Sequence, residues 1–273
     1  MRYFIIYAHP EPRSLNGSLK DAAVQALTQA GHEVRVSDLY AMRFKAVADA
    51  DDFPMRESGS RLVYHRESEQ AYKAGQLQPE VAREIENLIW AEVVVLQFPL
   101  WWFGPPAILK GWFDRVLVNG FAIGVPKPGT RQWLRYGEGV LKGRRGLQAV
   151  TTGGREAQFS ERGINGLIDD LLFPINHGFF HYTGIKALAP FVAFRTVRST
   201  AQEFVQMRDR YVTRLLAAGQ EEPIAYRSEN GGDYDETGKL RNGLGEGRSG
   251  FRLHLDDQRV CTLACEIAGQ GIP

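Results

Sequence analysis

Five short apolar runs alternate with amphipathic segments along this chain, and this alternation is the strongest constraint on its fold. The runs are rich in β-branched and aromatic residues, as in strands buried on both faces of a sheet. The segments between them carry apolar residues at helical spacing. The order predicts an α/β fold, a doubly wound sheet of five parallel strands with helices on both faces. The predicted strands span 4–8, 32–40, 92–100, 146–154 and 185–194, and the predicted helices span 14–31, 79–91, 105–118, 161–176 and 199–219.

Two stretches fall outside this alternation. Residues 41–78 are polar and irregular, and we expect a long surface loop there. Residues 226–250 are rich in glycine and charge, which is typical of loops and of flexible segments. Residues 251–257 alternate like a short strand. We therefore predict one domain over 1–220 and a small, loop-rich C-terminal extension over 221–273.

The charge balance and the cysteine content exclude several classes of protein. Lys and Arg together number 33 and Asp and Glu together 32, so no basic excess favours nucleic acid or an anionic membrane. No apolar run approaches the ~18 residues of a membrane-spanning helix, and residues 1–12 lack the pattern of a signal peptide. Cys261 and Cys265 imply no disulfide framework, so a reducing, cytoplasmic location is expected.

Right-handed crossovers place the loop after each parallel strand at one edge of the sheet, where ligands of such folds bind. The first of these loops, residues 8–20, lacks the G-x-G-x-x-G pattern of dinucleotide sites. Ser14, Asn16 and Ser18 stand instead at the start of the first helix, where free N–H groups favour an anion such as phosphate. Plain helix capping is the alternative. His9 follows the strand directly and is a further candidate.

The loop after the third strand, in the segment FPLWWFGPPAILKGWFDRV at 98–116, is dominated by large rings. Such rings are either core or dimer contacts or the walls of a slot for a flat aromatic ligand. A ring-lined slot beside a phosphate-binding turn suits a flavin nucleotide. The residues expected along it are Leu100, Trp101, Trp102 and Phe103.

The loop after the fourth strand contains two glycines, which let the backbone approach a ligand closely. Its N–H groups are candidates for stabilising negative charge on a ring as that ring is reduced. Many tight turns share this sequence, so the motif is weak alone. The loop consists of Thr151, Thr152, Gly153 and Gly154.

These motifs resemble the NAD(P)H:quinone oxidoreductase family, the DT-diaphorases and their relatives, which have a flavodoxin-like fold. The resemblance runs from AHPEPRSLNGSLKDAAVQAL at 8–27 to about Pro190, and FPLWWFGPPAILKGWF is its most specific part. It implies a bound flavin, FAD rather than FMN in view of the chain length. By resemblance His9, Leu15 and Asn16 would meet the pyrophosphate, residues 100–103 the isoalloxazine edge, and residues 151–154 its pyrimidine end.

The resemblance also implies an activity. Family members are two-fold dimers whose active sites draw on both subunits. NAD(P)H gives a hydride to flavin N5 and leaves, and a quinone then takes its place and accepts the hydride, which is a ping-pong scheme. The implied substrate slot is lined by Trp102, Phe103, Phe121, Ile123, Val125 and Tyr182.

Two positions in the catalytic region depart from the family pattern. Phe159 and Asn165 stand where the family has a tyrosine and a histidine that stabilise charge on the reduced flavin. Phe159 cannot donate a hydrogen bond, and Asn165 cannot exchange a proton near neutral pH. The catalytic candidates are therefore these two residues together with the backbone at Gly153.

The rim of the predicted pocket departs as well, because Ile123 and Val125 replace family tyrosines. Two alternatives follow from these changes. One is an NAD(P)H-dependent reductase of another acceptor, such as a nitroaromatic, an azo compound or free flavin. The other is a non-catalytic, flavin-binding regulatory subunit.

His177 and His181 form an H-x3-H pair, which places two imidazoles on one face of a helix, as in some metal sites. One branch of the family adds a cysteine to this pair, and Tyr226 occupies the matching position here. Two histidines without a third soft ligand make a weak site. We therefore predict no tightly held metal, with both rings packed near the pocket or the dimer contact.

Overall fold

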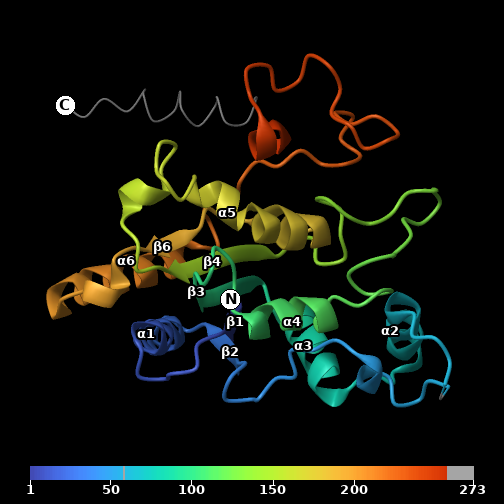
Figure 1. Ribbon diagram of the computed structural model, residues 1–273, viewed down its shortest axis with the longest axis horizontal. Coiled ribbons are helices and arrows are strands. Elements are labelled where there is room, and N and C mark those ends of the chain that lie inside the picture. Colours follow the sequence, from blue (N-terminus) through green and yellow to red (C-terminus); the bar gives the residue numbers. More distant parts are fainter. Residues whose placement is uncertain (58, 257–273) are drawn as a thin grey trace.

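The computed structural model describes residues 1–57 and 59–256, and it has a parallel β-sheet between two layers of helices (Figure 1). The strands run in the order β2-β1-β3-β4-β5, with β6 also paired to β4. The predicted flavodoxin-like fold class is confirmed, and β3, buried along its whole length, lies at the centre of the sheet. The strands are β1 Arg2–Tyr7, β2 Glu33–Asp38, β3 Val93–Pro99, β4 Arg145–Thr151, β5 Lys186–Ala187 and β6 Phe191–Ala193.

Each face of the sheet carries its own apolar core, since successive side chains of a strand point to opposite faces. Tyr3 and Ile5 of β1 pack on the face that α1 and α6 cover. Phe4 and Ile6 pack on the face that α3, α4 and α5 cover. These helices are α1 Leu15–Gln29, α3 Pro79–Trp90, α4 Ala107–Val116, α5 Ile168–Ile175 and α6 Ala201–Ala217.

The fifth predicted strand is divided into two short pieces. β5 pairs with the beginning of β4, and β6 pairs with its end. Pro190 lies between them, and a proline has no N–H to donate to the ladder. The prediction of one continuous strand over 185–194 is therefore wrong in detail, although both pieces occupy the predicted place.

The polar excursion at 41–78 contains a helix that the sequence did not predict, α2 (Tyr64–Ala74), which ends at Gly75 in a left-handed conformation. A buried ion pair joins the excursion to the domain. The guanidinium of Arg115 on α4 is buried and lies 2.8 Å from Asp52, whose other oxygen accepts from Tyr64 at 2.8 Å. The polar, irregular composition of residues 41–78 does not predict this helix, because the helix is stabilised by these tertiary contacts rather than by a local pattern.

The predicted helix at 161–176 begins later and continues further. α5 starts at Ile168, after a turn in which Asn165 N–H donates to Gln158 O at 2.9 Å. Past the proline at 174, the chain continues as the π-helix η3 (Asn176–His181). Pro174 removes one backbone donor from the helix, which favours the wider hydrogen-bond register.

The C-terminal extension packs against α5 in the part that the structure describes (Figure 1). Phe251 stacks on Phe173 with ring centroids 4.1 Å apart, and Arg252 lies 2.9 Å from Glu161. The predicted strand at 251–257 is wrong over its described part, 251–256: Gly250–His254 is a 3₁₀ helix, η5, and an isolated bridge joins Leu255 to Tyr226.

The composition predicted no membrane-spanning helix and no disulfide framework. Within the residues that the structure describes, no helix has both the length and the apolar character needed to cross a bilayer. Cys261 and Cys265 lie outside the described residues.

Candidate functional site

The loops that follow β1, β3 and β4 meet at the carboxyl edge of the sheet, as predicted for parallel strands. Asn16 Nδ2 at the start of α1 donates to Thr151 Oγ1 at 2.6 Å. Leu100 N–H donates to Thr151 O at 2.8 Å. Gln97 Nε2 in β3 donates to Asn16 O at 2.6 Å, and its Oε1 accepts from the Tyr211 hydroxyl. Each of the three loops is therefore fixed to another by a direct hydrogen bond.

Gln97 is a site residue that the sequence did not single out. It is buried in an otherwise apolar strand, where an amide is costly unless it is hydrogen-bonded. The one polar residue in the run VVVLQ was the signal that could have found it. Its role is to hold the first turn of α1 against the centre of the sheet.

The first turn of α1 combines capping with exposed donors. The Ser14 side chain accepts from Gly17 N–H at 3.1 Å, so this residue is an N-cap, as the alternative interpretation held. Asn16 is buried, and its Oδ1 has no hydrogen-bond partner within the described chain. Leu15 is half-buried and Ser18 is exposed. An orphan acceptor beside a helix N-terminus fits a polar ligand that also donates a hydrogen bond.

The turn after β3 holds its rings in an unusual backbone conformation. Trp101 and Gly104 exchange two backbone hydrogen bonds of 3.0 Å. Between them Trp102 and Phe103 have φ values of 49° and 62°, which non-glycine residues adopt at a cost. Trp102 is 97% exposed and Phe103 50%. His9 lies beside this turn, its ring centroid 6.1 Å from that of Trp101.

The turn after β4 presents one backbone donor outward. Gly154 N–H donates to Thr152 Oγ1 at 3.2 Å, and Thr152 is itself held by Ala193 and Thr196. Gly153 is exposed, and its N–H has no acceptor in the part of the chain that the structure describes. This N–H group is therefore exposed and could donate to a ligand.

Phe159 supports this turn from behind. The residue is buried, and its ring lies against Phe194 with centroids 5.8 Å apart. A Cβ on Gly154 would come within 2.6 Å of the Phe159 ring, so the glycine is needed for this close approach. Asn165 is half-buried on the loop that follows. Phe159 thus contacts the Gly154 backbone rather than open solvent.

Comparisons with known proteins fit this geometry. A family model described as a flavodoxin-like fold matches residues 1–215. A crystal structure from Klebsiella pneumoniae, described as a candidate quinone reductase, superposes with a TM-score of 0.90 and 48% identity, covering 94% of this chain and all of that chain. The chain belongs to the NAD(P)H:quinone oxidoreductase family.

Two curated relatives of this quinone oxidoreductase family extend the match. A ribosyldihydronicotinamide dehydrogenase-like protein of Penicillium crustosum is 45% identical over 257 residues, covering 93% of this chain and 95% of its own. The human ribosyldihydronicotinamide dehydrogenase [quinone] is 40% identical over 224 residues, covering 82% of this chain and 94% of its own. The resemblance predicted from the sequence is confirmed.

The residues expected to line the quinone slot of this family fall into two groups. Trp102 and Phe103 lie at the carboxyl edge of the sheet. Tyr182 lies near the amino edge, since the next residue accepts from Leu141 N–H and the chain then enters β5 beside the start of β4. Ile123 and Val125 follow α4, which runs back toward the same amino edge. One chain alone does not bring the two groups together.

Phe121 requires a correction. Its ring is buried in the core, with its centroid 5.9 Å from that of Tyr72 on α2. It is therefore not available to line a slot. Ile123, by contrast, is 45% exposed.

The histidine pair belongs to a larger ring cluster. The centroids of His177 and His181 are 5.2 Å apart, and His181 Nε2 lies 3.0 Å from Arg227 O. The extension adds His254, 5.4 Å from His177, which no local sequence pattern had indicated. Burial, helped by the two neighbouring imidazoles, lowers the pKa of His177 to about 3. Among the described residues, no group of three or more His, Cys, Asp or Glu side chains has an arrangement that could hold a metal ion.

Proposed function

We propose that this protein is a flavin-dependent NAD(P)H:quinone oxidoreductase that uses FAD. The observation that carries the proposal is the hydrogen-bonded junction of the three loops through Asn16 and Thr151. Exposed rings adjoin this junction, as does a Gly153 N–H that has no acceptor among the described residues. A bound flavin supplies two-electron hydride transfer between a nicotinamide and a quinone. Family membership and 48% identity to a quinone reductase candidate support the same activity.

The start of α1 is the proposed phosphate site. The N–H groups of Leu15 and Asn16 lie in the first turn and have no acceptor within the described residues. Free N–H groups at the start of a helix favour an anionic phosphate. Asn16 Oδ1 would accept from a hydroxyl of the same ligand, which satisfies an otherwise orphaned buried atom. His9 would lie beside the phosphate.

The turns at 101–104 and 151–154 are the proposed walls for the flat ring. Residues Trp101 to Phe103 would cover its edge and exclude water. The Gly153 N–H would donate to the end of the ring where negative charge develops on reduction. Phe159 holds Gly154 in place by packing and donates nothing, so this chain relies on backbone donors where the family uses a tyrosine.

The substrate site is proposed to require two copies of the chain. Trp102 and Phe103 of one copy would face Ile123, Val125 and Tyr182 of another, because these two groups lie at opposite edges of one sheet. Large exposed rings such as Trp102 are also typical of dimer contacts. A two-fold homodimer with two shared sites satisfies both observations. A cytoplasmic location is part of the proposal, since two cysteines in 273 residues suit a reducing compartment.

A second candidate is a reductase of a different acceptor, favoured by the non-donating Phe159 and by the apolar Ile123 at the rim. A non-catalytic flavin-binding subunit is the third. The visible spectrum of the purified protein, followed by chromatography of the released cofactor, tests flavin binding and separates FAD from FMN. Steady-state oxidation of NADH and NADPH against a panel of quinones, nitroaromatics and azo compounds then separates the three candidates.

Rapid turnover with quinones is the expected result. Turnover with the other acceptors alone would assign the second candidate, and flavin binding without turnover the third. A protein that stays colourless after incubation with both FAD and FMN would overturn the proposal as a whole.

A further inference from the structure

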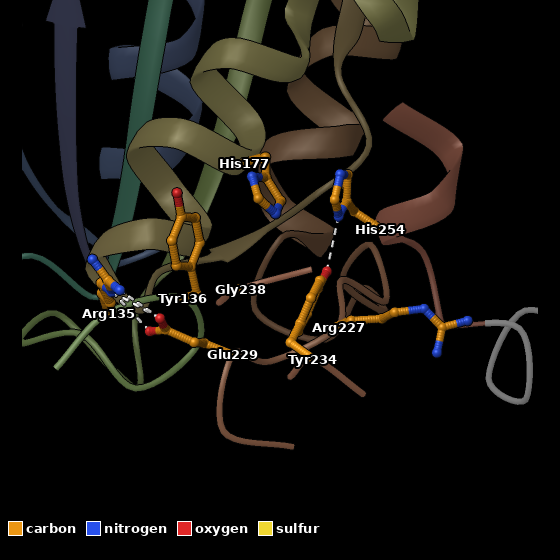
Figure 2. Close-up of a pocket in the computed structure, with 8 residues that line it drawn as sticks. All are labelled: Arg135, Tyr136, His177, Arg227, Glu229, Tyr234, Gly238 and His254. Carbon is orange, nitrogen blue, oxygen red and sulfur yellow. Dashed lines mark hydrogen bonds and ion pairs between the residues drawn. The ribbon is translucent and has the colours of Figure 1, made fainter. Parts of the chain in front are cut away.

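A cavity lies away from the loops of the proposed flavin site, beneath the C-terminal extension (Figure 2). Its volume is about 260 Å³. Its walls come from the loop before β4, from the π-helix η3 and from the extension. The lining residues are Arg135, Tyr136, His177, Arg227, Glu229, Tyr234, Gly238 and His254.

The charges around this cavity cancel one another. Arg135 forms a forked pair with Glu229, with N–O distances of 2.6 to 3.0 Å. Arg227 lies 2.7 Å from Asp233 and also donates to Leu253 O. Guanidinium groups that already hold carboxylates attract further anions weakly. The cavity therefore favours a neutral ligand over a phosphate or a carboxylate.

Aromatic rings form most of the remaining wall. The centroids of Tyr136 and His177 are 5.1 Å apart, and those of Tyr234 and His254 are 6.0 Å apart with planes 20° from parallel. Figure 2 shows these four rings arranged around a common space, with the Tyr234 hydroxyl turned toward His254. These rings pack against each other in pairs and present aromatic surface to the cavity, which favours a flat aromatic guest that stacks on a ring face or packs edge-on. The volume is below the ~300 Å³ at which drug-sized pockets begin, so a single ring fits it.

The imidazole of His177 is a hydrogen-bonding group within this aromatic wall. Phe173 stacks on its other face at 4.6 Å and fixes the ring orientation. Within the described residues neither ring nitrogen has a hydrogen-bond partner, unlike His254, which bonds Tyr234 at 2.8 Å. The lowered pKa keeps the ring neutral, so it offers one donor and one acceptor. A hydroxyl group on the guest would satisfy the acceptor.

We propose that this cavity is a binding site for a small, neutral, single-ring hydroxylated aromatic molecule, a phenol or a hydroquinone, whose hydroxyl donates to His177. The proposal is independent of the flavin site and of the activity proposed above. It assigns the histidine cluster to an organic ligand rather than to a metal. The guest would touch Tyr136, which packs edge-on against Tyr182 at 4.9 Å.

The test uses 4-fluorophenol as probe and ¹⁹F NMR line width as readout, with the full-length purified chain. Saturable broadening is expected with the phenol and about tenfold weaker binding with 4-fluoroanisole, which lacks the O–H donor. His177→Phe keeps a ring but removes the acceptor, and should raise the Kd of 4-fluorophenol about tenfold. The matched control His65→Phe changes an exposed histidine on α2 and should leave the Kd unchanged.

Equal binding of the two probes would overturn the proposal even if His177→Phe did not fold. Unchanged affinity in a folded His177→Phe variant would overturn it too. Displacement of the probe by equimolar Zn²⁺ would assign the cluster to a metal instead. The variant Trp102→Ala separates this site from the flavin rim: probe binding that disappears in Trp102→Ala would mean that the phenol occupies the flavin slot, whatever the outcome for flavin itself.

Discussion

Trp102 has features that packing alone does not explain. Its backbone has a left-handed conformation, which costs about 1–3 kcal/mol for a non-glycine residue. Its indole is almost fully exposed, so packing against the described residues does not offset that cost. Strained residues persist where the surroundings impose them, and the two hydrogen bonds between Trp101 and Gly104 do so here. The strain holds a large ring out from the sheet edge.

At the residue scale, Trp102→Ala should lower flavin retention and quinone turnover together, each by about tenfold or more, because a stacking surface is lost. Cofactor content per protein and kcat report the two effects. Trp90→Ala is the matched control, since Trp90 ends α3 at the amino edge of the sheet and stacks with Arg35. Full flavin content and full rate in Trp102→Ala would mean that the ring lies elsewhere.

The pair Phe159→Tyr and Asn165→His should restore donors behind the Gly153 turn. One well-placed donor contributes up to about 3 kcal/mol to a developing negative charge, so flavin reduction by NAD(P)H should accelerate by up to about 10²-fold. Stopped-flow absorbance measures this rate. Phe194→Tyr adds a hydroxyl to the neighbouring ring and should not accelerate it. An unchanged rate in the double variant would show that the backbone donors already suffice.

At the element scale, a buried carboxyl joins α3 to β2 and α4. Glu84 accepts from Ser37 Oγ at 2.7 Å and from Trp112 Nε1 at 2.8 Å. Burial raises the pKa of Glu84 above its usual range. Folding therefore favours the protonated form, and the stability that this group contributes is present below pH ~4.5 and is lost as pH rises through the raised pKa.

Glu84→Gln should remove this loss, because an uncharged amide can accept from Trp112 Nε1 through its oxygen and donate to Ser37 Oγ through its nitrogen. The free energy of unfolding, measured by urea titration from pH 4.5 to 8.5, should fall less with rising pH in the variant than in the parent. Glu86→Gln, on an exposed position of the same helix, should retain the parent profile. Parallel profiles for parent and Glu84→Gln would contradict the assignment.

At the π-helix η3, stability depends on pH in the opposite sense. The pKa of His177 lies far below that of an exposed imidazole, at about 3, so folding favours its neutral form. Its contribution to stability is present above pH ~6.5 and is lost as pH falls toward 3. His177→Phe should therefore reduce the acid sensitivity of the melting temperature between pH 6.5 and 4, whereas His65→Phe should not. Equal acid sensitivity in the parent and in His177→Phe would count against a buried, neutral imidazole.

The elements that the sequence predicts well are those whose residues carry local signals. The valine run of β3 and the capped start of α1 at Ser14 need no distant partner to be recognised. The elements it misses depend on remote contacts. α2 is held by Asp52 and Arg115, and the ring of His254 meets His177 only after the extension folds back.

In the candidate site, too, some features follow from local sequence signals and others depend on packing. The loops at 14–18, 100–103 and 151–154 were predicted from their place after apolar strands, and the structure brings them together. The burial of Phe121 and of Phe159 could not be predicted, because the sequence does not distinguish a loop aromatic that packs in the core from one that lines a pocket. Gln97 was not predicted because it lies inside β3, whereas the candidate residues were identified from the loops that follow the strands.

At the scale of the whole molecule, the separation of Trp102 from Tyr182 leads to a test of the shared site. Trp102→Ala and Tyr182→Ala should each lose quinone turnover as homodimers. Differently tagged chains, co-expressed and purified as mixed dimers, should regain about half of the parent rate, because one of two sites is then intact. Mixed dimers no faster than either parent variant, or a monomeric mass near 30.6 kDa by sedimentation, would exclude a site shared between chains.

The ion pair of Arg252 with Glu161 and the stack of Phe251 on Phe173 fasten the tail to the stretch that leads out of the Gly153 turn into α5. These two contacts allow the sequence outside the core to affect the candidate site. A change in the length or sequence of the C-terminal extension would alter how firmly the neighbouring turn is held, while the contacts of the sheet remain the same. Relatives with different C-terminal segments can therefore share this fold and differ in turnover rate.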